Sequence, residues 1–128
     1  MPKRAHDSRP PVAVGHVFLE VSDVGRAAQF FVGRGLRPID EGEDFAVLEL
    51  RGGTHLLLSR TRKKIKPNAE APFDLMVDDI DAAREDCKNA GLRPSRLRRS
   101  HFHRSFTVAG PDGHVFTITS SHAGSRPV

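Results

Sequence analysis

The chain has no tryptophan and no tyrosine among its 128 residues, and Cys87 is its single cysteine. One cysteine excludes a disulfide within the chain and is typical of a reducing compartment, so we expect a cytoplasmic protein. Long apolar runs are missing as well. The longest, such as Leu56–Leu58, fall far short of the ~20 residues that span a bilayer. Since no apolar run follows the charged first residues, the sequence predicts neither a membrane partner nor a secretion signal.

Positive charge exceeds negative charge by four, and the excess is concentrated in two stretches. Residues 60–66 hold five cations, and residues 93–104 hold five arginines together with His101 and His103. Such clusters can attract phosphate-rich partners. However, acidic stretches at 40–44 and 78–86 balance them, and no Tyr or Trp is present to stack on bases. We therefore expect solvated surface and no nucleic acid, with a basic interaction module as an alternative.

The chain repeats itself at nearly half its length. Gly-Leu-Arg-Pro occurs at 35–38 and again at 91–94, a spacing of 56 residues. At the same spacing, Asp23 falls on Asp79 and Val21 falls on Val77. Such a repeat predicts two copies of one structural unit, which would leave a cleft between them when folded side by side.

The first half shows the pattern of one strand, one helix and three further strands. Apolar residues alternate along residues 14–21, which predicts a half-buried strand with His16, Phe18 and Glu20 on one face. Asp23 is positioned to cap a helix over 24–34, and Gly35 to end it. Strands are expected near 37–40, at 45–50 and at 54–60, with a glycine turn at 52–53.

The second half predicts the same order, with strands at 73–77, near 97, at 105–109 and at 114–119. Its helix is capped by Asp79 and ended by Gly91. We predict an α+β fold of two tandem βαβββ modules, whose mixed sheets curl into a cup while the helices cover the outer face. The predicted divisions are a flexible tail 1–13, a first module 14–60, a basic linker 61–71, a second module 72–120 and a flexible tail 121–128.

Three segments resemble a known family. They are Gly-His-Val-Phe-Leu-Glu-Val-Ser-Asp at 15–23, Phe-Asp-Leu-Met-Val-Asp-Asp-Ile-Asp at 73–81 and Gly-Pro-Asp-Gly-His-Val-Phe at 110–116. In order and spacing the chain resembles the vicinal oxygen chelate superfamily, which includes glyoxalase I, extradiol dioxygenases and bleomycin-resistance proteins. The last segment is similar to the family's Asp-Pro-Asp-Gly-Asn turn, with Gly110 in place of the first Asp and His114 in place of Asn. The resemblance also implies a homodimer.

The family's metalloenzymes hold a divalent metal in the cup through His or Glu on the first and last strands of the modules. Carried over by position, the resemblance implies that these places are His16, Leu57, Pro72 and Thr117. A catalytic metal usually needs about three protein ligands, and only His16 is a metal-binding residue. We therefore predict no metal cofactor, with His16 and His55 as the remaining candidates for a divalent metal.

The function predicted from these residues is metal-free binding or sequestration of a small organic molecule in the cup. Glu20 and Asp74 would favour a cationic ligand. One alternative is a divergent metal-dependent lyase, isomerase or dioxygenase, with His16, His55 and an unidentified carboxylate as ligands. A metal-free enzyme with Glu20 or His16 as general base also stays open, and no catalytic residue is assigned. The predicted cup face comprises His16, Phe18, Glu20, His55, Leu57, Ser59, Asp74, Met76, Thr117 and Thr119.

Overall fold

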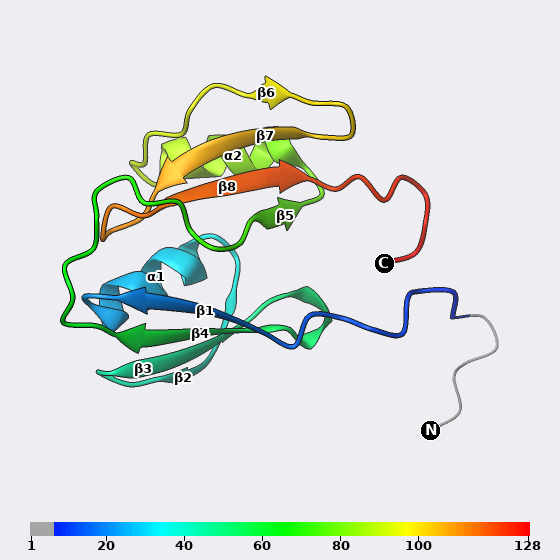
Figure 1. The fold of residues 1–128 in the computed structure, drawn as a ribbon. Coiled ribbons are helices and arrows are strands. Elements are labelled where there is room, and N and C mark those ends of the chain that lie inside the picture. Colours follow the sequence, from blue (N-terminus) through cyan, green and yellow to red (C-terminus); the bar gives the residue numbers. More distant parts are fainter. Residues whose placement is uncertain (1–6) are drawn as a thin grey trace.

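Each half of the chain folds into a four-stranded mixed sheet with one helix, and the two sheets lie side by side (Figure 1). The structure is a computed structural model, and it describes residues 7–128. In the first module the sheet order is β1-β4-β3-β2, with β1 parallel to β4 and the other pairs antiparallel. Its elements are β1 (His16–Val21), α1 (Val24–Gly33), β2 (Arg37–Glu41), β3 (Phe45–Glu49), the 3-10 turn η1 (Arg51–Gly53) and β4 (His55–Arg60).

The second module repeats this arrangement with the order β5-β8-β7-β6, and β5 runs parallel to β8. The predicted pair of βαβββ modules is therefore confirmed, although the sheets remain two separate units and do not close. Within residues 7–128, neither helix is long and apolar enough to cross a membrane. The elements are β5 (Leu75–Val77), α2 (Ile80–Asn89), β6 (Arg98–Arg99), β7 (Arg104–Ala109) and β8 (Val115–Ser120).

The two helices begin and end in the same way, as the repeat predicts. The Asp23 carboxylate accepts a hydrogen bond of 3.0 Å from the backbone N–H of Arg26, and Asp79 accepts one of 3.0 Å from Ala82. Each carboxylate thus satisfies a backbone donor that the first helical turn leaves free. Beyond the last turns, Gly35 and Gly91 adopt φ angles of 109° and 82°, a left-handed conformation that glycine adopts without steric cost.

One hydrophobic core joins the helices to the inner faces of both sheets. Alternate residues of β1 and β4, such as Leu19 and Leu58, point to the helix side and are buried. Phe31 on α1 and Cys87 on α2, which are 56 residues apart and so occupy equivalent positions of the repeat, are both 1% exposed. The core crosses between modules, because the ring of Phe31 lies 5.1 Å from that of Phe116 on β8.

Polar contacts also join the modules, and the repeat relates them to each other. The backbone N–H and the hydroxyl of Ser22 both donate to the Asp112 carboxylate at 2.6 Å. Arg51 donates to both carboxylate oxygens of Asp78, at 3.1 and 2.8 Å. In each case the end of one module's first strand contacts the hairpin turn of the other module. Ser22 and Asp78 are equivalent positions of the repeat, and Arg51 lies next to Gly52, the residue equivalent to Asp112. The modules are thus arranged with approximate two-fold symmetry.

Candidate functional site: the open sheet faces and the seam between modules

Six of the predicted cup residues lie together on one face of the first sheet. The register of β1 against β4 places His16 opposite His55, Phe18 opposite Leu57, and Glu20 opposite Ser59. Because side chains alternate along a strand, all six point away from the face on which α1 packs. We call this surface, together with the outward residues of β3 beside it, the open face of the first module.

The open face exposes large apolar side chains. Phe18 is 62% exposed and Phe45, on β3, is 44% exposed. In the second module, Met76 is 48% exposed. Apolar side chains that gather on one surface mark a place where another molecule binds more often than singly scattered ones do.

The second module contributes the other four predicted residues, which differ in exposure. Met76 on β5 lies opposite Thr119 on β8, and Asp74 comes just before β5. Asp74 is exposed and Thr117 is half-buried. Thr119 is only 7% exposed and so has little surface to offer a ligand.

A row of four polar side chains crosses the open face near the start of β1. His55 Nε2 lies 3.0 Å from Glu49 Oε2, and the other oxygen of Glu49 lies 3.1 Å from the guanidinium of Arg37. The His16 ring stands beside that of His55, with 6.2 Å between the centroids. The carboxylate fixes the orientation of the His55 ring and determines which ring nitrogen is free for another molecule.

Glu49 and Arg37 were missed in the sequence, although a signal for Glu49 was present. Glu49 and His55 each lie three residues from Gly52, and residues at equal distances from the centre of a tight hairpin face each other. The structure pairs them in register. Arg37 could not be placed in the same way, because the β2–β3 register shifts between Pro38 and Asp40.

The residues present do not fit a divalent metal of the kind that the family resemblance implies. Within residues 7–128, no three His, Cys, Asp or Glu side chains are grouped so that they could hold a metal ion. The Glu49 carboxylate, which contacts His55, has one oxygen against that ring and the other against Arg37. Pro72 has no donor atom in its side chain, and Leu57 has none either.

A hollow of about 900 Å³ lies at the seam, between the start of β1 and the start of β5. Of the ten predicted cup residues, Asp74 and Met76 line this hollow, and the other eight do not. Asp7 and residues 9–14 form part of its wall. The predicted tail thus covers the seam from residue 7 onward, and residues 1–6 lie outside the described part of the chain.

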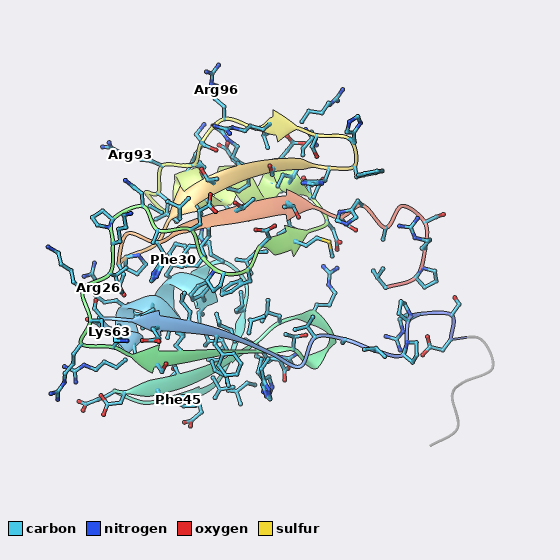
Figure 2. All side chains as sticks on the ribbon, viewed as in Figure 1. Arg26, Phe30, Phe45, Lys63, Arg93 and Arg96 are labelled. Atoms are coloured by element: carbon cyan, nitrogen blue, oxygen red, sulfur yellow. The ribbon has the colours of Figure 1, made fainter. Side chains whose placement is uncertain are left out.

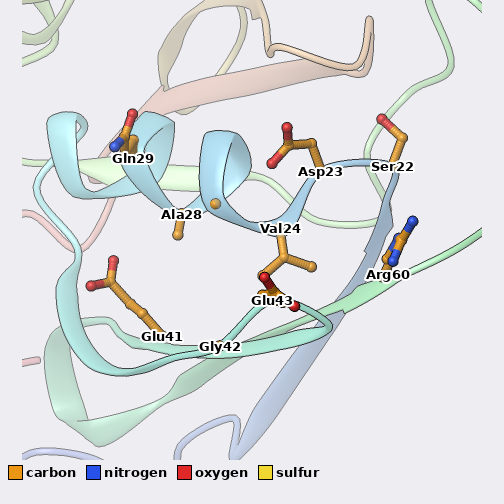
Figure 3. Close-up of a pocket in the computed structure, with 10 residues that line it drawn as sticks. Ser22, Asp23, Val24, Ala28, Gln29, Glu41, Gly42, Glu43 and Arg60 are labelled. Carbon is orange, nitrogen blue, oxygen red and sulfur yellow. The ribbon is translucent and has the colours of Figure 1, made fainter.

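A second, more polar hollow of about 700 Å³ lies at the start of α1 (Figure 3). Its lining includes Asp23, Glu41, Glu43 and Arg60. Asp23 already caps the helix, and Arg60 lies 3.3 Å from the Asp44 carboxylate. The two glutamates that remain form an acidic rim on the helix side of the sheet, away from the open face.

The two basic stretches lie on outer surfaces of the molecule. Figure 2 shows Arg93 and Arg96 pointing outward from the second module, and Lys63 at the linker. The cations of β6 sit on the outer edge of the second sheet, where charge discourages pairing with a strand of another molecule. His101 and His103 follow β6, and the ring of His103 lies 5.6 Å from that of His122.

Comparison with known families and structures is consistent with this fold. The family model of the glyoxalase-like domain matches residues 16–119. No curated protein matches the chain. A lactoylglutathione lyase from Agrobacterium tumefaciens has a similar structure, with a TM-score of 0.73 and 15% identity, over 91% of this chain and 99% of that one.

Two further structures show the same likeness. A member of the glyoxalase/bleomycin resistance protein/dioxygenase superfamily from Sphaerobacter thermophilus has a TM-score of 0.71 and 20% identity, over 86% of this chain and 98% of that one. The oxidase ChaP-H2 has a TM-score of 0.70 and 22% identity, over 92% and 100% of the two chains. At these identities the likeness establishes the fold alone.

Proposed function

The chain belongs to the family of glyoxalase-like domains, and from that premise we propose that it binds a small organic molecule without a resident metal. The molecule is held by the predicted cup residues other than the buried Thr119, and by the seam between the two modules. No bond is made or broken, and the effect of the protein is sequestration.

The observation that carries this proposal is the exposure of Phe18, Phe45 and Met76 on sheet surfaces. Burial of apolar area contributes about 25 cal/mol per Å², so these side chains would gain free energy from covering by a ligand. Small-molecule sites combine such apolar surface with a few polar groups that fix orientation. Here His55, held by Glu49, supplies a ring nitrogen of fixed direction.

The charge of the site favours a cationic molecule. Glu20 lies on the open face and Asp74 lies at the seam, and neither forms an ion pair with a residue between 7 and 128. An unpaired carboxylate attracts an ammonium or iminium group and repels an anion. Drug-like organic cations are therefore the ligand class that we propose, and a superfamily that includes bleomycin-resistance proteins makes bleomycin a natural first probe.

Isothermal titration calorimetry tests the proposal on the full chain after dialysis against a chelator. Bleomycin and the cationic dye tetramethylrosamine serve as probes, and we expect at least one of them to bind without added metal. A ligand at a hundred times its Kd should also stabilise the fold by about 2.7 kcal/mol. Phe18→Ser should weaken binding by about fivefold or more through lost apolar contact, whereas Phe102→Ser, on the exposed loop after β6, should not.

Two results would overturn the proposal. In the first, neither probe binds. In the second, binding appears only after stoichiometric Ni²⁺, Zn²⁺, Mn²⁺ or Fe²⁺ is added, and this would favour the metal-dependent alternative. Equal loss of affinity in Phe18→Ser and Phe102→Ser would show that the open face has no special part in binding.

A further inference from the structure

The hollow at the seam is built largely from apolar side chains of both modules. Val17 of β1 and Leu50, next to η1, come from the first module, and Phe73 and Leu75 come from the second. The segment before β1 completes the wall with Val12 and Val14, which are 82% and 62% exposed. A volume of about 900 Å³ falls within the range of roughly 300–1,000 Å³ that drug-sized ligands occupy.

A smaller hollow of about 390 Å³ continues along the same seam. The two hollows share Leu50, Arg51, Leu75 and Met76 as lining residues. Arg51 is the charged residue that lines both hollows, and it forms an ion pair with Asp78 at 2.8 Å. The seam thus offers an extended space in which the larger hollow is mainly apolar, whereas the smaller one is also lined by Arg34, Asp79 and Asp86.

Only one charged side chain in the larger hollow lacks an ion-pair partner among residues 7–128. Arg51 is paired with Asp78, and Arg9 donates to both carboxylate oxygens of Asp7, at 3.0 and 2.9 Å. The hydrogen bonds from Arg9 lower the pKa of Asp7 to about 2, so this pair is ionised and mutually neutralised at neutral pH. The unpaired side chain is that of Asp74, and its carboxylate gives the lining of the hollow a negative charge.

We propose that the seam holds the apolar body of an organic cation, with its cationic group beside Asp74. The inference rests on the proposed function and deepens it, because it assigns the larger part of the ligand to the junction of the modules and leaves the smaller part to the open face of the first module. An anion of the same shape is excluded by the unpaired carboxylate. The segment from Asp7 to Val14 contacts the bound molecule from the outer side.

Fluorescence polarisation with two dyes of one skeleton tests this site. Tetramethylrosamine is a xanthene cation, and fluorescein is a xanthene anion at neutral pH. The full chain should bind the first and not the second. Val14→Lys adds a cation at the rim of the hollow and should weaken tetramethylrosamine binding by about tenfold. Phe102→Lys adds the same charge at another exposed apolar position and should leave binding unchanged.

Each outcome decides a different point. Unchanged binding in Val14→Lys, together with weaker binding in Phe18→Ser, would place the ligand on the open face alone and overturn the seam site while leaving the proposed function intact. Equal weakening of dye binding in Val14→Lys and Phe102→Lys would show that the loss of affinity comes from the net charge of the protein, and this would also overturn the seam site. Failure of the unchanged protein to bind either bleomycin or the cationic dye would count against the proposed function itself. Asp74→Asn should weaken cation binding more than Glu20→Gln, and the reverse order would contradict the assigned position of the charge.

Discussion

At the scale of single residues, the departure of the last turn from the family's pattern has a packing reason. A side chain at position 110 would meet the ring of Phe116, because a Cβ built on Gly110 lies 2.6 Å from Phe116 Cε2. Phe116 is 2% exposed and contacts the rings of Phe30, Phe31 and Phe73. Because Gly110 has no side chain, the ring of Phe116 can occupy its position at the centre of the core between the modules.

Gly110→Ala should destabilise the fold by about 1–3 kcal/mol, because overpacking forces Phe116 or the turn to move. Chemical denaturation followed by circular dichroism measures the change. Gly15→Ala is a matched control, since no atom lies within 4 Å of a Cβ at that position, and it should change stability by less than about 0.5 kcal/mol. Similar stabilities for the two variants would contradict the steric explanation.

At the scale of elements, the duplication predicts equal behaviour from equivalent helix caps. Asp23→Ala and Asp79→Ala should each lower the free energy of unfolding by about 1 kcal/mol, since each removes a carboxylate bonded to a backbone N–H at 3.0 Å. Urea denaturation provides the measurement, with Asp40→Ala on exposed β2 as a control that should be nearly neutral. A loss in Asp79→Ala no larger than that in Asp40→Ala would show that α2 does not depend on its cap.

The elements were predictable because each one carries a local signal. The alternation of apolar residues predicted β1. The pairs Asp23 with Gly35 and Asp79 with Gly91 predicted where the two helices begin and end. The contents of the site were harder to predict. His55 was identified as a candidate, but the Arg37–Glu49 contact depends on a register shift that no local pattern in β2 reveals. The seam was less predictable still, because Val14, Leu50 and Phe73 meet there only through the packing of one module on the other.

At the scale of the whole molecule, two kinds of contact join the modules, and they differ in strength. At the outer edge of the contact between the modules, which we call the rim, the pairs Ser22–Asp112 and Arg51–Asp78 are both exposed to solvent. The interior carries the aromatic cluster around Phe116. Exposed polar pairs contribute little to stability, whereas a buried aromatic side chain contributes several kcal/mol. The shared core, and not the rim, should make the modules unfold as one.

Asp112→Ala should therefore cost only about 1 kcal/mol and should leave a single unfolding transition. Phe116→Leu removes part of the shared ring cluster and should cost more, about 1–3 kcal/mol, because the aromatic contacts and some of the packing are lost. Differential scanning calorimetry compares the calorimetric and van 't Hoff enthalpies of both variants, which agree when unfolding is two-state. Two separate transitions in Asp112→Ala, with one retained in Phe116→Leu, would mean that the rim couples the modules. In that case the approximate two-fold symmetry of the rim contacts would be the structural basis of cooperativity, and the aromatic core would serve each module separately.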